Sequence, residues 1–308
     1  MASMKAARVH AWGGSEVVQI EDIPVPEPKQ DEILIRVRAA SVNPVDWVTV
    51  QGYLKSFMSL PVALGSDAAG EVVTVGKSVT DISVGDAVYA PTGGGSFAQY
   101  VAVAGKNVSR KPTSLDYTAA AAVPVVAQTA WQALFAAGQL RAEQKVLIHA
   151  AAGGVGHIAV QLAKWKGAYV IGTASAENAD FVRGLGADQV IDYHSTRFED
   201  VVQDADVILV TVSGDTLDRS YDAAKPGGIV VSVVGPPSEE KARARGVRTA
   251  RAAGRNSNRT ELDEITRLID AGVVKPTVSA VYPLEQIREA LDAVATHHTR
   301  GKIVVTVP

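Results

Sequence analysis

One segment constrains the fold of this chain more than any other. It is an apolar run, a glycine-rich turn and an amphipathic helix in direct succession. The apolar run covers residues 145–150, and the helix has Ile158 and Leu162 on its apolar face. The turn between them consists of Ala151, Ala152, Gly153, Gly154, Val155 and Gly156. This order matches the dinucleotide-binding fingerprint G-x-G-x-x-G, with alanine at the first glycine position.

Two glycines of this turn have a physical reason. Gly153 lets the backbone approach a pyrophosphate closely, and Gly156 lets the helix pack tightly on the strand. The start of the helix then offers free N–H groups to phosphate oxygens. A second strand, residues 169–173, completes the βαβ context that supports the motif. We therefore expect a nucleotide site here, whereas the alternative for a glycine cluster is a structural turn.

The pattern of the chain changes near Leu115. Before it, from residue 5 to residue 105, short runs rich in Val and Ile are separated by glycines, which predicts a small antiparallel barrel or sandwich. After it, apolar runs of strand length alternate with helical patterns, which predicts a parallel sheet with crossover helices.

The tail adds two helical patterns, at residues 258–271 and 284–295, and a last strand at residues 302–307. We expect that strand to return to the first domain. The predicted division is therefore an N-terminal β-rich domain of residues 1–122 and 276–308, and a dinucleotide-binding domain of residues 123–275.

Composition excludes several classes of site. The chain of 308 residues has no Cys, so it has no disulfide, thiolate nucleophile, Fe–S cluster or Cys-ligated zinc. Its net charge of -3 gives no reason to expect nucleic acid or an anionic membrane as a partner. The most apolar stretch, residues 119–137, is interrupted by Pro124 and two Gln, which favours a buried helix over a membrane span. Because no signal-peptide pattern follows Lys5, we expect the protein in the cytoplasm.

The residues after the second strand bear on the choice of cofactor. An NAD site has Asp or Glu there to bind the ribose hydroxyls, whereas this chain has Ser175. A serine hydroxyl can hydrogen-bond a 2′-phosphate, and Arg183 and Tyr193 are further candidates for it. Glu177 argues against this, because its carboxylate would repel a phosphate. The other interpretation of Ser175 is a helix N-cap. We expect NADPH in preference to NADH.

Further segments place the chain beside a known family. They comprise residues 41–46, 64–73, 84–89, 95–100, 150–156 and 301–305. In this order they resemble the zinc-free branch of the medium-chain dehydrogenase/reductase superfamily, of the quinone oxidoreductase type, over nearly the whole chain. The resemblance implies an α/β protein with a GroES-like β-rich N-terminal domain and a Rossmann domain with a doubly wound parallel sheet. It also implies a cleft between the domains and a homodimer.

Zinc-dependent relatives have Cys near position 43 and a His-Glu pair at the positions of Ser66 and Asp67. This chain has Asn43 there and no Cys, and its six His are scattered or paired near a helix end. Without Zn²⁺, oxidation of an alcohol lacks its usual Lewis acid. Reduction of an electrophilic quinone or enone does not need one, so we expect activity without a metal.

The resemblance also suggests which residues meet the reacting groups. Asn43 matches a position beside the nicotinamide pocket, although an Asx-turn is a serious alternative. Thr129 matches a position on the nicotinamide ribose side, and its alternative is a back-bonded Thr inside a helix. Val234 and Gly235 end a strand at the carboxyl edge of the sheet, where ligands of such folds bind. Lys302, in the matching C-terminal segment, is counted among the cofactor contacts.

Two features remain open. Val48 stands where relatives commonly have a Tyr, so the proton for enone reduction would come from water. Residues 241–259 are locally basic, which we interpret as a solvated face, with an anionic ligand as the alternative. The sequence thus predicts an NADPH-dependent, metal-independent reductase of small-molecule quinones or α,β-unsaturated carbonyls. The alternative is a dinucleotide-binding structural or regulatory protein with vestigial catalysis.

Overall fold

The polypeptide crosses repeatedly between two units. The computed structural model describes residues 2–252, 258–296 and 298–308. Unit 1 holds the described residues up to 125, those of 258–270 and those from 276 onward. Unit 2 holds residues 126–252 and 271–275.

The sheet of unit 2 has the order β11-β10-β9-β12-β13-β14 over the described residues, and each neighbouring pair is parallel. The strands are β9 (Lys145–Ile148), β10 (Tyr169–Ala174), β11 (Gln189–Asp192), β12 (Ala205–Val210), β13 (Ala224–Ser232) and β14 (Arg248–Arg251). The predicted Rossmann-type parallel sheet is confirmed. Its central strands carry fully buried apolar side chains such as Leu147, Ile208 and Val230, as expected for a sheet covered on both faces.

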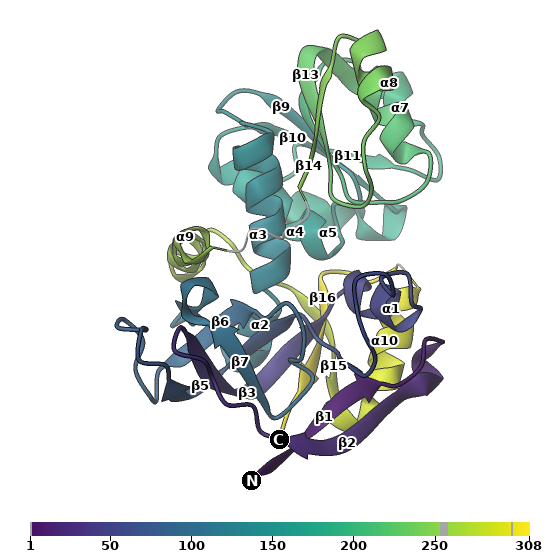
Figure 1. The fold of residues 1–308 in the computed structure, drawn as a ribbon. Helices are drawn as coiled ribbons and strands as arrows, with labels where there is room; N and C mark the ends of the chain where they lie inside the picture. Colours follow the sequence, from purple (N-terminus) through teal and green to yellow (C-terminus); the bar gives the residue numbers. More distant parts are fainter. Residues whose placement is uncertain (1, 253–257, 297) are drawn as a thin grey trace. The chain divides into compact units, whose positions relative to one another are not determined.

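Helices connect these parallel strands, because a parallel pair needs a crossover connection. They are α4 (Gly154–Trp165), α5 (Ala179–Gly184), α6 (Phe198–Val201), α7 (Thr216–Ala223) and α8 (Glu239–Ala244). Helix α3 (Pro124–Trp131) and its π-helical continuation (Gln132–Ala137) precede β9. Figure 1 shows them around the sheet. Helix α4 packs on β9 and β10, whereas α7 packs on β12 and β13. No helix in the described ranges is both long and apolar enough to cross a membrane.

Unit 1 is β-rich, which confirms the GroES-like N-terminal domain. One sheet has the order β2-β1-β4, and the other has the order β15-β16-β3-β5-β6-β8, with β7 also paired to β3. The strands are β1 (Ser3–Val9), β2 (Val18–Pro24), β3 (Glu32–Val42), β4 (Val62–Ala63), β5 (Asp67–Val75), β6 (Ala87–Pro91), β7 (Tyr100–Ala104), β8 (Ser109–Arg110), β15 (Val278–Pro283) and β16 (Lys302–Thr306). The last strand returns to this unit as expected, because β16 pairs antiparallel with β3.

The core of unit 1 combines residues from both ends of the chain. Ile33 and Ile35 of β3 are buried together with Val305 of β16 and Leu291. Leu291 belongs to α10 (Ile287–Ala295), which lies along β16, β15 and β3 (Figure 1). Two further helices of the unit are α1 (Pro44–Val50) and α2 (Tyr117–Ala121).

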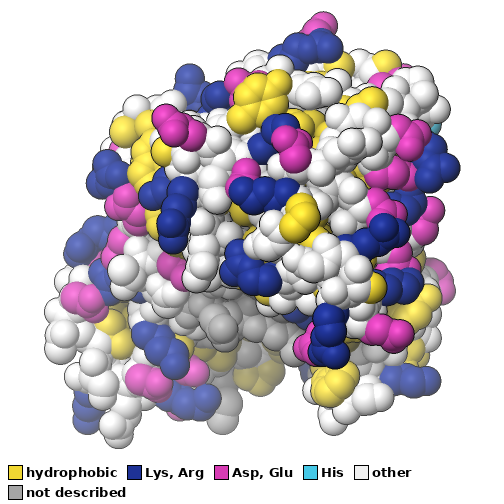
Figure 2. All heavy atoms as spheres, turned by 90° about the horizontal axis from the view of Figure 1, so that it is seen from above, with side chains coloured by type: hydrophobic (Ala, Val, Ile, Leu, Met, Phe, Trp, Pro, Cys, Tyr) yellow, Lys and Arg dark blue, Asp and Glu magenta, His cyan; other side chains and the backbone are white. Residues whose placement is uncertain are grey.

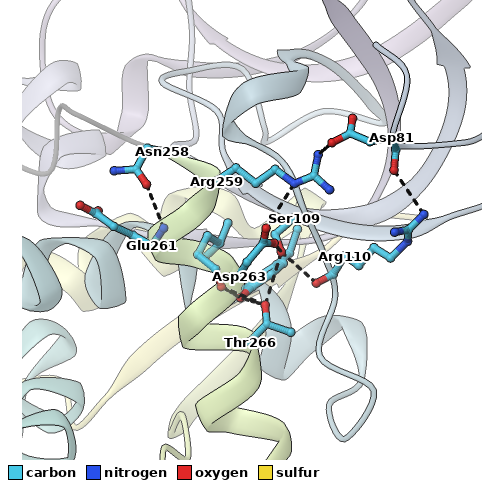
Figure 3. Close-up of polar contacts among 10 residues, drawn as sticks. Asp81, Ser109, Arg110, Asn258, Arg259, Glu261, Asp263 and Thr266 are labelled. Atoms are coloured by element: carbon cyan, nitrogen blue, oxygen red, sulfur yellow. Dashed lines mark hydrogen bonds and ion pairs between the residues drawn. The ribbon is translucent and has the colours of Figure 1, made fainter. Parts of the chain in front are cut away.

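Helix α9 (Arg259–Asp270) packs on β8 of unit 1, although the sequence-based division placed it in the dinucleotide-binding domain. The Ser109 hydroxyl in β8 hydrogen-bonds Asp263 of α9, and Arg259 forms an ion pair with Asp81 (Figure 3). The helical pattern of α9 reveals its apolar face, but it does not reveal which surface covers that face. The expected division therefore differs from the two units at this helix.

Candidate functional site

The turn between β9 and α4 gives the first backbone N–H groups of the helix no side-chain cap. Helix α4 begins at Gly154, and Gly153 precedes it in an extended conformation (φ −78°, ψ −177°) with no side-chain cap. A helix of this length carries partial positive charge at its N-terminus. The structure thus brings Ala152, Gly153, Val155 and Gly156 together at an end suited to a phosphate group. We call residues 149–156 the Gly loop.

The two outer glycines of this loop tolerate a side chain very differently. A Cβ at Gly156 would clash with the carbonyl oxygen of Ala150 and would lie 2.8 Å from the Cα of Ala151. A Cβ at Gly153 would meet only the Ala150 oxygen, at 3.2 Å, and the Ala150 Cβ at 3.9 Å. Gly156 is therefore required by the packing of the loop on itself, whereas Gly153 leaves room on its outer side. This open cradle fits a pyrophosphate, whose oxygens would replace the missing side chain.

The backbone at the start of the loop is held in an unusual conformation. Ala150 has φ +46°, a region that costs a non-glycine residue roughly 1–2 kcal/mol. Thr173 holds it there: its hydroxyl accepts from the Ala150 N–H at 3.2 Å, and its carbonyl accepts from the Ala151 N–H at 2.9 Å. Sequence reasoning missed this role of Thr173, because Thr173 belongs to β10 whereas the Gly loop follows β9.

His149 is a second hidden support of the Gly loop. Its ring is buried, with Nε2 3.1 Å from the Ser220 hydroxyl and Nδ1 3.3 Å from the Thr173 hydroxyl. Burial, together with the nearby Arg219, lowers the pKa of His149 to about 3. The ring is therefore neutral at physiological pH, and its two nitrogens contact Thr173 and Ser220 in the interior of unit 2.

The tip of β10 brings two of the predicted cofactor residues together. The Tyr193 N–H donates to the Ala174 carbonyl at 3.3 Å, so exposed Tyr193 lies beside Ser175. The Ser175 hydroxyl accepts from the Asn178 side chain at 3.0 Å and makes no capping bond to the backbone. Arg183 is not part of this group, because its guanidinium pairs with Asp180 at 2.7 Å on an exposed surface.

The end of β13 supplies an open stretch of backbone. Both the Val234 and Gly235 N–H groups donate to the Ser232 hydroxyl, at 3.4 and 3.2 Å. A Cβ at Gly235 would have no neighbour within 4 Å. Because β12 and β13 run parallel to β9, this end belongs to the same carboxyl edge as the Gly loop. Thr129 lies buried in α3 of the same unit.

A second polar centre lies in unit 1. Asn43 is 2% exposed, and both ends of its amide have protein partners. Its Oδ1 accepts from the Lys302 ammonium at 2.6 Å, and its Nδ2 donates to Asp67 Oδ2 at 2.8 Å. The Lys302 ammonium also donates to the Val42 carbonyl at 2.9 Å. The side chain of Lys302 is thus directed into the interior of unit 1, whereas the sequence-based expectation counted it among the cofactor contacts.

Asp46 links this centre to the start of α1. Its carboxylate accepts from the Asn43 N–H at 2.8 Å, which closes a capping box over the helix. It also accepts from the Ser66 hydroxyl at 2.9 Å. Burial raises the pKa of Asp46 to about 6 and also raises the pKa of Asp67, whose Oδ2 accepts from the Ser41 hydroxyl at 2.7 Å.

We call these six side chains the Asn43 network: Ser41, Asn43, Asp46, Ser66, Asp67 and Lys302. They come from β3, the start of α1, β5 and β16. The Asx-turn alternative identified a local bond at Asn43, but the bond to Lys302 spans 259 positions of the chain. No local pattern could have shown it.

This network does not fit a zinc ion. Protein ligands of Zn²⁺ are Cys, His and carboxylates, all bound as anions or neutral bases. Here the oxygen of Asn43 is already bonded to an ammonium, which would repel a divalent cation. Among the residues that the structure describes, no group of three or more His, Cys, Asp or Glu is arranged to hold a metal.

The basic segment shows the ion pairs of a solvated face over its described part. Lys241 pairs with Asp218 at 2.6 Å, and Arg245 pairs with Asp222 at 2.7 Å. Figure 2 shows Lys and Arg side chains interspersed with Asp and Glu on the face that it displays. The segment also contains strand β14 at the edge of the sheet, which the charge pattern concealed. Its residues 253–257 lie outside the described residues.

Comparison with known proteins shows the family of the chain. Residues 29–113 match the alcohol dehydrogenase GroES-like domain, and residues 185–305 match the zinc-binding dehydrogenase family. The chain is 37% identical to the chloroplastic NADPH-dependent alkenal/one oxidoreductase of Arabidopsis thaliana, over 98% of this chain and 79% of that protein. It is 31% identical to the quinone oxidoreductase of Mus musculus, over 97% and 96% of the two chains.

Solved structures extend the likeness to the whole fold. The quinone oxidoreductase of Coxiella burnetii has a TM-score of 0.93 and 34% identity, covering 100% of both chains. The Escherichia coli quinone oxidoreductase complexed with NADPH has a TM-score of 0.90 and 28% identity, covering 98% of this chain and 99% of that one. By its two domain matches and by these relatives along its whole length, the chain belongs to the quinone oxidoreductase-like branch of the medium-chain dehydrogenase/reductase superfamily.

Proposed function

We propose that this protein is an NADPH-dependent, metal-independent reductase of quinones or α,β-unsaturated carbonyls. The observation that carries the proposal is the Gly loop. It leads into a helix start without a side-chain cap, and its Gly153 leaves room for a phosphate. The relatives named above support the choice of reaction class. When bound, NADPH supplies a hydride from C4 of its nicotinamide.

Residues of unit 2 would hold this cofactor. The backbone of Ala152 to Val155 and the start of α4 would bind the pyrophosphate. Ser175 and Tyr193, which lie together at the tip of β10, would receive the 2′-phosphate. Val234 and Gly235 would border the nicotinamide, because the backbone there is open. Thr129 remains a candidate for the ribose side of the nicotinamide.

Residues of unit 1 have a supporting role in this proposal. Because both ends of the Asn43 amide are engaged within the protein, we assign Asn43 to holding the start of α1. The acceptor needs no Lewis acid, since a quinone or enone is already electrophilic. Water would protonate the reduced acceptor, because the side chain of Val48 in α1 has no group that can donate a proton.

A homodimer is part of the same proposal. Over the described residues β14 forms one edge of the sheet of unit 2, and its outer backbone groups have no strand partner there. Such an edge is a common site for pairing with another chain. Light scattering on the purified protein gives the mass, and a monomer at micromolar concentration would contradict this part.

The decisive experiment follows oxidation of NADPH in the presence of a simple quinone and a panel of enones. We expect turnover with at least one acceptor class, and the same rate after dialysis against EDTA. The matched control is Gly153→Val, which should keep its fold but turn over far more slowly at the same NADPH concentration. Tight NADPH binding without turnover on any acceptor would favour the binding-protein alternative. Activity that EDTA removes and Zn²⁺ restores would contradict metal independence.

A further inference from the structure

The Asn43 network contains an electrostatic problem that the reductase proposal does not address. Asp67 is fully buried, and Asp46 and Lys302 are each 3% exposed. Isolated buried carboxylates are costly unless a counter-charge and hydrogen bonds compensate them. Within this network, over the described residues, the hydrogen bonds from a cationic side chain come from Lys302. Its ammonium donates to the Val42 carbonyl and to Asn43 Oδ1.

The hydrogen bonds show how that charge is distributed. Lys302 contacts Asn43 at 2.6 Å, and Asn43 contacts Asp67 at 2.8 Å, so one amide separates the ammonium from the carboxylate. The remaining oxygen of Asp67 accepts from the Val125 N–H at 2.7 Å. Lys302 is thus the first member of a chain of contacts that ends at the start of α3.

We propose that Lys302 is an internal counter-cation for the buried carboxylates of Asp67 and Asp46, and that it is a positioning residue for the start of α1. It compensates Asp67 and Asp46, and it holds the side chain of Asn43, whose backbone N–H donates to Asp46 at the start of α1. The kinetic part of this inference rests on the proposed reductase function, whereas the charge compensation does not.

A double-mutant cycle tests the compensation without any assay of turnover. Lys302→Met removes the charge but keeps the length of the side chain, and Asp67→Asn removes the opposing charge. We expect Lys302→Met to lower Tm by about 10 °C, the range for breaking a buried pair. Asp67→Asn should lower Tm in the wild-type background and raise it in the Lys302→Met background. The exposed Lys29→Met is the matched control and should leave Tm unchanged.

Two outcomes would overturn the compensation. One is an equal change in Tm on Asp67→Asn in both backgrounds, which would reduce Lys302 to a donor of hydrogen bonds. If Lys302→Met alone does not fold, the double variant decides: a folded double variant supports the proposal, and an unfolded one overturns it.

Steady-state kinetics test the positioning role. We expect Lys302→Met to lower kcat for a quinone by about 10-fold or more, while KM for NADPH stays within about 2-fold, because the cofactor residues are in unit 2. An unchanged kcat in a folded variant would overturn the positioning role. If the wild-type protein itself shows no turnover, the reductase function fails, while the Tm cycle still decides on the counter-cation.

Discussion

The Gly loop of unit 2 is built by leaving side chains out, whereas the Asn43 network of unit 1 is built by gathering side chains together. At Gly153 and Gly156 the backbone itself forms the surface, and the residues that shape the loop are neighbours along the chain. In the network, residues as distant as Asn43 and Lys302 satisfy one another at 2.6 Å. A site made of backbone is sensitive to added atoms, and a site made of buried charges is sensitive to removed ones. Each prediction below tests one side of that contrast.

The largest effect is expected for an added methyl at Gly156. Gly156→Ala places Cβ inside the Ala150 carbonyl, so the loop must move away from the start of α4. We expect stability to fall by about 3–5 kcal/mol and NADPH binding to be lost. Chemical denaturation and fluorescence titration measure the two effects. Gly184→Ala, where a Cβ would have no neighbour within 4 Å, is the control and should be neutral or slightly stabilising. Equal behaviour of the two variants would contradict the role of close packing.

Gly153→Val separates binding from folding within the same loop. The backbone of Gly153 is extended, and a Cβ meets one oxygen at 3.2 Å, so a small shift accommodates the new side chain. The valine methyls would then occupy the space meant for a phosphate. We expect the affinity for NADPH to fall by about 3 kcal/mol with the fold largely intact. Near-normal affinity in the folded variant would mean that the loop is only a turn.

The two regions should also respond to pH with opposite sign. Unfolded His149 binds a proton near pH 6.5, whereas the folded residue does so only near pH 3. Its contribution to stability is therefore complete above pH 6.5 and falls by about 3 kcal/mol between pH 6.5 and pH 4. Asp46, whose pKa is raised to about 6, contributes most below pH 4, and its contribution is lost as pH rises through 6.

Hydrogen exchange measured separately on β9 and β3 at pH 4, 5 and 6.5 resolves these two trends. His149→Gln should remove the loss of protection in β9 at low pH, and Asp46→Asn should remove the opposite trend in β3. The same slope in His149→Gln as in the wild-type protein would show that another group titrates there.

The tip of β10 tests how much of cofactor choice comes from a single hydroxyl. A charge-assisted hydrogen bond contributes roughly 1.5–3 kcal/mol, so Ser175 should favour NADPH over NADH by about ten- to a hundredfold. Ser175→Asp should reverse the preference, because its carboxylate repels the phosphate and accepts from the ribose hydroxyls. Arg183→Gln is the control and should change little, since Arg183 pairs with Asp180. The ratio of kcat/KM for the two cofactors measures this, and a wild-type preference for NADH would contradict it.

The contrast between the regions also explains what the sequence could predict. Gly153, Gly156 and the strands around them follow one another within a few tens of residues, so their spacing carries the fold and the loop. The bond from Lys302 to Asn43, the docking of α9 on β8 and the support from Thr173 depend on tertiary contacts. A buried lysine and a phosphate-binding lysine look alike in sequence, so the matching C-terminal segment could not show that Lys302 bonds Asn43. Arg183 similarly lies near Ser175 in the chain, but its pairing with Asp180 directs it elsewhere.

The smallest effect concerns the strained residue at the start of the Gly loop. Ala150 has φ +46°, and glycine adopts this conformation without cost, although glycine also has more freedom when unfolded. The two terms nearly cancel, so Ala150→Gly should stabilise the protein by about 0.5 kcal/mol. Gln139→Gly is the control, because Gln139 has φ +52° at an exposed position outside the loop. If the strain serves to aim the loop, only Ala150→Gly should also weaken NADPH binding, by about 2- to 5-fold. Equal NADPH affinities in both variants would mean that Thr173 alone holds the loop and that the strain at Ala150 has no function of its own.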